Sequence, residues 1–303
     1  MTSKEKERGA SGVESSVSVV IPAFNEEESI GPIIGEIRNI LGGGVEIVVV
    51  DDGSRDATAA VARERGATVY QHPYNMGNGA AVKTGLRRVR SDVVVLMDGD
   101  GQHDPKDIPR LLEHTGQYDM VVGSRTSGSA SSWHRGLANR VYNGLASYVT
   151  QFPVGDLTSG FRAIRRETAR SFLYLLPNRF SYPTTITLAV LKSGLRVKYV
   201  PIRSRARVGK SKIRIVTDGP RFLLIIVKIA TLFSPFRIFL PVSLLFFTLG
   251  IGYYTYTFVT QHRFTNMSML LFVTSVIIFM LGLVAEQVAE LRMDRSEVDW
   301  DTQ

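Results

Sequence analysis

The first two hundred residues alternate between short apolar runs and amphipathic stretches. Continuous apolar or β-branched runs, typical of strands covered on both faces, occupy residues 17–22, 45–50, 67–71 and 92–97. Stretches with helical spacing lie between them, at residues 26–41, 54–66 and 77–90. Ser54 is expected to cap the second of these helices. The strict alternation predicts an α/β domain with a mainly parallel, doubly wound sheet, in which ligands bind at the carboxyl ends of the strands.

Two longer apolar runs follow near the C-terminus. Residues 238–260 and 264–285 contain no charged side chain, and at 1.5 Å per residue each would span roughly 33 Å. The alternative, a pair of buried core helices, rarely has runs this long without a charge. The link between them, "QHR", is short enough only for a turn. The sequence therefore predicts a transmembrane hairpin, with both ends of the protein on one side.

The distribution of positive charge predicts which side that is. The chain carries a net charge of +8, and residues 196–228 contain ten Lys or Arg and one acidic residue. By the positive-inside rule, the N-terminal domain and both termini are expected in the cytoplasm. Because this cluster adjoins two membrane spans, anionic lipid is the expected partner and nucleic acid is not. The chain has no cysteine, so disulfides and thiol chemistry are excluded.

These patterns divide the chain into five segments. The stretch before the hairpin is apolar with Arg214, Arg221 and Lys228 spaced seven apart, which indicates a face lying along the lipid headgroups. The expected segments are a polar tail (1–16), a catalytic domain (17–212), an amphipathic interfacial segment (213–235), the transmembrane hairpin (236–290) and a cytoplasmic tail (291–303).

Polar clusters follow each of the four predicted strands. They read "PAFNEEE", "DDGSRDAT", "HPYNMGNGAA" and "DGDGQHD". Any one of them is compatible with ordinary turn chemistry, because Asp, Asn and Gly dominate turns. Together they are expected to line one crevice with the polar residues Asn25, Glu26, Asp51, Asp52, Asn75 and the group that begins at Asp98.

The last cluster has the composition of a metal site. Asp98 and Asp100 are separated by one glycine, and Gln102 follows, so that two or three oxygens can converge on one hard cation such as Mg²⁺. His103 is expected to support this group rather than to be a ligand, because hard cations favour oxygen. No P-loop motif is present in the sequence.

At this point the sequence resembles the family-2 glycosyltransferases of the GT-A fold, and more narrowly the polyprenyl-phosphate sugar synthases typified by dolichyl-phosphate mannose synthase. The resemblance runs from about Val17 to the C-terminal tail. It is carried, in order, by the motifs "VVIPAFNEE", "VVVDDGSRDAT", "NMGNGAA", "MDGDGQHDP", "VVGSR", "DLTSGFRA" and "RVGKSKI".

The resemblance implies roles on the donor side. Asp98 would lie near the ribose and the metal, and Asp100 and Gln102 would ligate Mg²⁺ or Mn²⁺ and through it the diphosphate. The residues expected to bind the nucleotide sugar are Pro22, Phe24, Glu26, Asp51, Asp52, Asn75, Gly77, Asp98, Arg205, Lys210 and Lys212. The last three belong to the loop 203–214, which is expected to fold over the diphosphate, hinged at Gly209, to dock on lipid, or to do both, and the sequence does not separate these roles.

The acceptor side is expected to use arginines, since guanidinium groups match phosphate bidentately. The candidates are Arg125, Arg135, Arg140 and Arg162. The resemblance implies that Arg125 and one arginine of the following helix, preferably Arg135, touch the lipid phosphate, with Asn139 adding a hydrogen bond. The alternative for Arg140 is that it solvates a helix face.

A phosphate acceptor also explains why the "ED" pair of many relatives is missing between residues 150 and 165. A phosphate monoester is largely dianionic at neutral pH, so positioning and metal-assisted departure of the nucleotide suffice. Asp156 is then expected to orient the arginines, and the alternative is a general base. No "QxxRW" motif occurs, which favours transfer of one sugar per encounter.

The resulting hypothesis is a metal-dependent, inverting, membrane-anchored glycosyltransferase. It would move one hexose from GDP-mannose, UDP-glucose or UDP-N-acetylglucosamine to dolichyl or polyprenyl phosphate, with Asp98, Asp100 and Asp156 as its catalytic residues. One alternative acceptor is a diacylglycerol-type lipid hydroxyl, which would require a base. Another alternative is a catalytically idle subunit that only binds nucleotide sugar. A homo-oligomer is compatible with the sequence.

Overall fold

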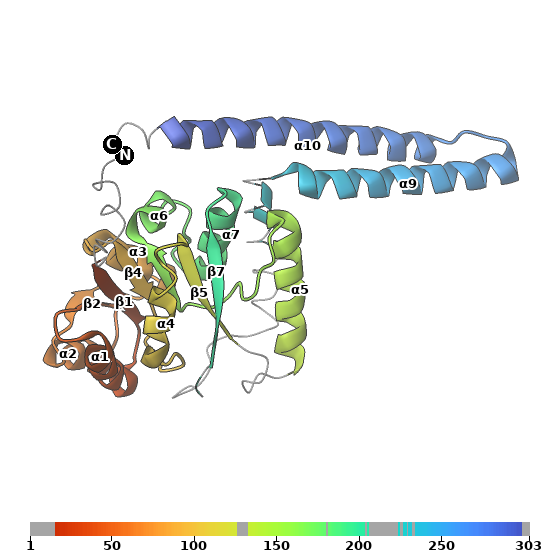
Figure 1. The fold of residues 1–303 in the computed structure, drawn as a ribbon. Helices are drawn as coiled ribbons and strands as arrows, with labels where there is room; N and C mark the ends of the chain where they lie inside the picture. The colour runs from red at the N-terminus through yellow and green to blue at the C-terminus, as the bar shows by residue number, and fades with distance from the viewer. Residues whose placement is uncertain are drawn as a thin grey trace, which may run out of the picture. The chain divides into compact units, whose positions relative to one another are not determined.

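The computed structural model describes residues 16–125, 133–179, 181–203, 205, 224, 227–228, 230–231 and 234–298. The chain divides into two compact units (Figure 1). The first comprises residues up to Trp133 together with Gly155–Lys212, and the second comprises His134–Val154 and Ile213–Gln303. Residues 134–154 thus group with the C-terminal part, and the division of the chain into five segments stays a prediction.

The first unit is built on a seven-stranded sheet with the strand order β3-β2-β1-β4-β6-β5-β7. Its strands are β1 (Val17–Ala23), β2 (Glu46–Asp51), β3 (Thr68–Gln71), β4 (Val93–Leu96), β5 (Met120–Arg125), β6 (Arg162–Arg165) and β7 (Val197–Ile202). All neighbours pair in parallel except β6, which runs antiparallel to both β4 and β5. The prediction of a mainly parallel sheet is confirmed, and each of the four predicted strands is present.

Helices connect the strands of this unit. They are α1 (Glu27–Leu41), α2 (Thr58–Glu64), α3 (Asn78–Arg88), the 3₁₀ turn η1 (Pro105–Asp107), α4 (Ile108–Leu112), α6 (Arg166–Ser171) and α7 (Tyr182–Lys192). The inner face of α1 carries fully buried side chains such as Ile30, Ile34 and Ile37, which belong to one core cluster with Val49 and Val95 of the sheet. The layers are held together mainly by the burial of this apolar surface.

The expected N-cap at Ser54 is wrong. Helix α2 begins at Thr58, after Ala57, and the Ser54 hydroxyl accepts a hydrogen bond from the backbone amide of Asn25 at 2.9 Å. Asn25 has a left-handed backbone, with φ of 55°, and its side chain accepts from the Arg55 amide at 2.9 Å. The "DDGS" stretch therefore connects the loops after β1 and β2, and this long-range partner displaces the local cap.

The second unit contains the helices α5 (Trp133–Thr150), α9 (Phe236–Gln261) and α10 (Asn266–Val298). The Arg237 guanidinium donates to the carbonyls of Tyr148 and Val149 at 3.0 and 3.2 Å, which explains why α5 groups with the C-terminal helices. It satisfies acceptors that the end of a helix leaves without an intrahelical partner.

Helices α9 and α10 form the predicted hairpin. Two segments, Phe236–Gln261 and Asn266–Leu291, are long and apolar enough to cross a membrane, and the turn after α9 places His262 in a left-handed conformation. The hydroxyls of Ser243 and Ser275 each donate to the other residue's carbonyl at 3.0 Å. Most of the predicted interfacial segment, residues 213–235, lies outside the described residues.

Candidate functional site

The candidate site lies at one edge of the sheet in the first unit. Strands β1, β2 and β4 run in parallel, so their carboxyl ends share this edge. Because β6 is antiparallel to both β4 and β5, the carboxyl end of β5 and the amino end of β6 reach the same edge. The loops after β4 and β5 and the loop before β6 therefore meet there, although they are far apart in the sequence.

The loop after β2 holds two buried carboxylates. Asp51 accepts from the Ser54 amide at 3.0 Å and from the Gln71 side chain at 3.2 Å. Asp52 accepts from the amides of Met76 and Gly77 at 2.9 and 2.8 Å. The Asp52 carboxylate thus fixes the loop that leads into α3, and a direct contact of Asp52 with the nucleotide stays a prediction.

The same loop needs glycine at position 77. Gly77 has φ of 106°, and a Cβ there would lie 2.7 Å from the Cα of Arg179. Only glycine adopts this conformation without strain and admits the neighbouring backbone so closely. Asn75, two residues earlier, is exposed. The backbone conformation therefore explains why glycine occupies position 77 of the motif "NMGNGAA". Contacts of Asn75 and Gly77 with a nucleotide sugar stay a prediction.

The loop after β1 carries the other expected nucleoside residues. Pro22 lies buried within β1, beside Val50 of β2. Phe24 and Glu26 are both half-buried. The Glu26 carboxylate accepts from the Ser29 hydroxyl at 3.2 Å, and that hydroxyl donates to the carbonyl of Gly99 at 2.6 Å. These bonds link the first predicted nucleotide motif to the loop that carries Asp98 and Asp100.

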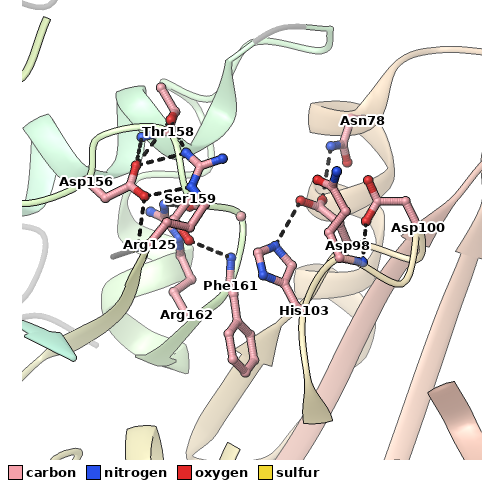
Figure 2. A network of polar contacts seen from close by, with 12 residues as sticks. Asn78, Asp98, Asp100, His103, Arg125, Asp156, Thr158, Ser159, Phe161 and Arg162 are labelled. Atoms are coloured by element: carbon pink, nitrogen blue, oxygen red, sulfur yellow. Dashed lines mark hydrogen bonds and ion pairs between the residues drawn. The ribbon is translucent and has the colours of Figure 1, made fainter. Parts of the chain in front are cut away.

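Asp98 and Asp100 are on the same turn, directly after β4, and Figure 2 shows both side chains on the side that faces Asn78. Asp98 accepts from the Asn78 side chain at 3.4 Å, and its Oδ2 lies 3.7 Å from Nε2 of His103. Asp100 accepts from the backbone amide of Gln102 at 3.2 Å. Burial raises the pKa of Asp98, but His103, Asn78 and Arg162 outweigh it and hold the pKa below its usual value. The Asp98 carboxylate is therefore ionised at neutral pH.

This donor set fits a hard divalent cation that also binds substrate. Among the residues that the structure describes, no three His, Cys, Asp or Glu side chains form a complete metal cage. Mg²⁺ and similar ions commonly take one or two carboxylates from the protein and complete their shell with water and substrate phosphates. Two carboxylates on one turn, Asp98 and Asp100, with the Gln102 side chain two residues on, suit that arrangement.

His103 lies next to the acidic group, and its supporting role stays a prediction. It is 5% exposed, and its ring stacks on Phe161 with centroids 5.2 Å apart. Its Nδ1 is buried without a hydrogen-bond partner among the described atoms. Figure 2 shows His103 and Phe161 between the Asp98 turn and a second polar cluster, which contains Arg125 and Asp156.

Arg125 and Asp156 form a bidentate ion pair. Nε of Arg125 donates to Oδ2 at 2.9 Å, and Nη2 donates to Oδ1 at 3.1 Å and also to the hydroxyl of Thr158. Burial raises the pKa of Asp156, but the Arg125 guanidinium outweighs it and holds that pKa below its usual value. Asp156 thus lies where the orienting role requires it, and its low pKa disfavours the role of a general base.

Arg162 is fully buried and hydrogen-bonded within the domain. Its guanidinium donates to the carbonyl of Ser159, to the carbonyl of Pro183 at 3.2 Å and to the Thr187 hydroxyl at 3.1 Å. An acceptor phosphate would have to displace these partners. The structure shows Arg162 as support for the loop before β6, and its contact with a phosphate stays a prediction.

Gly160 is a site residue that the sequence reasoning missed. An added Cβ at this position would collide with the Asp98 carboxylate. Two hydrogen bonds fix the backbone at this position: Tyr182 donates to the Gly160 carbonyl at 3.1 Å, and Arg162 donates to the carbonyl of the neighbouring Ser159. Gly160 therefore leaves the space that Asp98 occupies. The glycine in "TSGFR" was the only sequence sign of this packing.

Of the three loop residues predicted to meet the diphosphate, the structure describes Arg205. Arg205 pairs with Asp104 at 2.8 Å and with Glu36 at 3.4 Å, and its amide donates to the Gln102 carbonyl at 2.9 Å. It therefore lies beside the acidic turn. Lys210 and Lys212 lie outside the described residues.

Three predicted acceptor residues are on α5, which groups with the second unit. Arg135 and Asn139 are within this helix, and their side chains lie outside the described part of the chain. Arg140 is exposed, as a residue that solvates a helix face would be. Their contact with an acceptor phosphate stays a prediction.

Comparison with known families gives two matches. Residues 18–173 match Glycosyl transferase family 2, and residues 234–291 match the GtrB C-terminal hairpin. The first match covers the strand-end loops described above, from the β1 loop through Asp98 and Arg125 to Arg162. The second covers α9 and most of α10.

Two relatives illustrate the sequence likeness. The dolichyl-phosphate hexose transferase of Haloferax volcanii is 33% identical over 217 residues, which is 70% of this chain and 93% of that protein. The undecaprenyl-phosphate 4-deoxy-4-formamido-L-arabinose transferase of Edwardsiella ictaluri is 33% identical over 171 residues, which is 52% of this chain. The match spans about half of the latter protein, 51% of its length.

A solved structure shows the same fold. The glucosyl-3-phosphoglycerate synthase of Mycobacterium tuberculosis, in complex with Mn²⁺, uridine diphosphate and its glucosylated product, superimposes with a TM-score of 0.60 at 22% identity. The superposition covers 72% of this chain and 80% of that one. The predicted α/β fold of the GT-A type is confirmed.

Proposed function

The chain belongs to glycosyl transferase family 2, and from this premise we propose that it transfers one hexose from a nucleoside-diphosphate sugar to a polyprenyl or dolichyl phosphate. The relatives named for dolichyl-phosphate and undecaprenyl-phosphate transfer support this acceptor class. The C-terminal hairpin supports it as well, because a lipid acceptor requires an enzyme at the membrane.

The observation that carries the proposal is the placement of two oppositely charged groups at one sheet edge. The Asp98 and Asp100 carboxylates lie on one side of His103 and Phe161, and the Arg125 guanidinium lies on the other (Figure 2). Arg125 is 32% exposed through its side chain, so part of it is open to a ligand. A nucleotide diphosphate held through a cation at the acidic turn and a phosphate held at Arg125 would be neighbours.

The donor side would use a divalent metal. Asp98, Asp100 and Gln102 would hold Mg²⁺ or Mn²⁺, and the bound cation would neutralise charge on the departing diphosphate. Support comes from the chemistry of these side chains and from the related fold that binds Mn²⁺ with uridine diphosphate. The Asp51 loop and the Phe24 and Glu26 region would enclose the nucleoside.

The acceptor side would act by positioning the lipid phosphate. Arg125, whose Nε and Nη2 are held by Asp156 and Thr158, would bind the lipid phosphate through Nη1 and present an oxygen of that phosphate to the anomeric carbon. A bond would form between that oxygen and the sugar while the bond from the sugar to the nucleoside diphosphate breaks, and a single displacement of this kind inverts the anomeric centre. The phosphate is already ionised at neutral pH, so no proton has to be removed.

We further propose that this reaction occurs at the cytoplasmic face. In the sequence, the ten basic residues between positions 196 and 228 shortly precede two helices that can cross a membrane. The positive-inside rule then places the first unit and both termini in the cytoplasm.

The test is a donor panel with purified full-length protein in non-ionic detergent. The assay would combine Mg²⁺ or Mn²⁺, a short polyprenyl phosphate and radiolabelled GDP-mannose, UDP-glucose or UDP-N-acetylglucosamine, followed by extraction into organic solvent. We expect label in the organic phase with one donor and only when lipid phosphate is present. If every donor leaves the lipid phosphate unlabelled while a lipid alcohol is labelled, the acceptor assignment is wrong. If no lipid is labelled at all, the protein is a binding subunit and not the proposed enzyme.

A further inference from the structure

A second cluster of charge lies in the first unit, away from the site described above. It forms a cavity of about 490 Å³. The cavity, here called the arginine pocket, is lined by Tyr70, Arg87, Arg88, Val89, Arg90, Arg166 and Arg170. Its volume lies within the range of small-molecule sites in proteins, roughly 300–1,000 Å³.

The fold places the arginine pocket at the opposite edge of the sheet from Asp98. Arg87 and Arg88 end helix α3, and Arg90 lies in the link that enters β4 at Val93. Strand β6 ends at Arg165, which pairs with Val93, so α6 begins at this same amino end of β4. Helices α3 and α6 contact each other and are adjacent in Figure 1.

The arginine pocket concentrates positive charge that its surroundings neutralise only in part. Within the part of the chain that the structure describes, none of its five guanidinium groups forms an ion pair with a carboxylate. The nearby Asp92 carboxylate attracts Arg166 electrostatically and accepts from the amide and the hydroxyl of Ser16, both at 3.0 Å, so it offsets only part of the charge of the five guanidinium groups. Five like charges around one cavity repel one another, and an anion would relieve that repulsion.

Two features organise the pocket. The Arg88 guanidinium lies 4.8 Å above the centre of the Tyr70 ring, a cation–π contact that holds it against β3. The Nε of Arg166 is buried and has no hydrogen-bond partner among the described residues. A buried donor without a partner is unfavourable, and a bound anion would provide an acceptor at this position.

We propose that the arginine pocket binds a polyvalent phosphate anion, at a site separate from the Asp98–Asp100 turn. Guanidinium groups bind phosphate oxygens through paired, charge-assisted hydrogen bonds. A concave site lined by five guanidinium groups accommodates a compact anion with several negative charges better than an extended, flat anionic surface. Such a group is found on a free diphosphate and on the headgroup of a phosphomonoester lipid.

The test uses the full-length protein in non-ionic detergent with EDTA, so that binding through a divalent cation is removed. Inorganic pyrophosphate would be titrated by calorimetry into the unmodified protein, into the double variant Arg88→Gln/Arg170→Gln, and into Arg65→Gln. Arg65 is an exposed arginine outside the pocket and is the matched control for loss of charge. A soluble short-chain phosphatidic acid would be titrated in the same way.

We expect at least one of the two probes to bind the unmodified protein and the Arg65→Gln control equally, and to bind the double variant at least about tenfold more weakly. Preference for pyrophosphate would identify a free phosphate, and preference for phosphatidic acid would identify a lipid headgroup. Equal binding by the double variant, or no binding of either probe to the unmodified protein, would overturn the proposal. The thermal unfolding of each variant would be measured without ligand, and the two single variants would replace the double variant if it is unstable.

Discussion

The Arg125 guanidinium meets the Asp156 carboxylate along two hydrogen bonds, from Nε to Oδ2 at 2.9 Å and from Nη2 to Oδ1 at 3.1 Å. The two residues are 31 positions apart and come together because β6 returns antiparallel between β4 and β5. The pair fixes the plane of the guanidinium. A fixed guanidinium loses little freedom when it binds a phosphate, which is the advantage of preorganisation.

Replacing Arg125 with lysine tests this geometry. Lysine keeps the charge but loses the paired hydrogen bonds, so we expect kcat/KM for lipid phosphate to fall on the order of tenfold to one hundredfold. The KM for the nucleotide sugar should change little. Steady-state kinetics with each substrate varied in turn would separate these effects. Arg165→Lys is the matched control, because Arg165 lies near Asp119 at the far end of β6. Equal losses in both variants would contradict the assignment.

Gly160 and Asp98 provide a steric test. In Gly160→Ala the new methyl group would collide with the Asp98 carboxylate, which must then move from its place beside His103. We expect transfer activity to fall at least about tenfold, with a higher metal concentration needed for half-maximal rate. Gly116→Ala is the control, since a Cβ at position 116 meets nothing within 4 Å. Full activity in Gly160→Ala would show that the position of Asp98 is unimportant.

Asp100→Asn tests the metal assignment. Removing one ligand charge weakens the hold on a hard cation, and we expect the rate at saturating donor to fall on the order of one hundredfold or more. Raising the Mn²⁺ concentration should restore part of the loss. Asp107→Asn in the neighbouring turn η1, where Asp107 pairs with Arg110 at 2.5 Å, should leave the metal dependence unchanged. Identical Mn²⁺ titrations for Asp100→Asn and the unmodified protein would rule out Asp100 as a ligand.

The lowered pKa of Asp156 predicts a dependence of stability on pH. The unfolded carboxyl takes up a proton near its ordinary pKa of about 3.9, whereas the folded one does so at a lower pH. The stabilisation is therefore complete above the unfolded pKa and is lost as the pH falls through the folded pKa. In Asp156→Asn the loss of folding stability on lowering the pH should be smaller. Thermal unfolding of the full chain in detergent, followed from about pH 5 to about pH 3, would show it, and parallel curves for both proteins would refute it.

The first half of the sheet was predictable from the sequence. The runs at 17–22, 45–50, 67–71 and 92–97 are continuous and apolar. Such runs are typical of strands that are buried on both faces, as in the core of a parallel sheet. The polar loops after them reach one edge because parallel strands share their carboxyl ends. The same reasoning predicted that the turn with Asp98 and Asp100 lies at that edge. The hairpin helices were predictable separately, from their length and lack of charge.

The second half of the site depends on contacts that no local pattern shows. Strand β6 is only four residues long, and its antiparallel direction follows from tertiary packing. The sequence analysis expected Asp156 to orient the acceptor arginines, but neither its choice of Arg125 nor the close approach of Gly160 to Asp98 could be derived from spacing. Arg162 also depends on tertiary contacts, because its guanidinium donates to Ser159, Pro183 and Thr187, partners that its motif does not reveal, and its predicted contact with an acceptor phosphate stays a prediction.

The central claim is that a lipid phosphate, bound at Arg125, accepts the sugar. The most direct measurement compares a polyprenyl phosphate with the polyprenol of the same chain length, using the donor that the panel identifies and following label in the organic phase. We predict transfer to the phosphate with the unmodified protein, a strongly reduced rate with Arg125→Lys, and no transfer to the alcohol. Transfer to the alcohol at a comparable rate, or a rate on the phosphate that is unaffected by Arg125→Lys, would contradict this account.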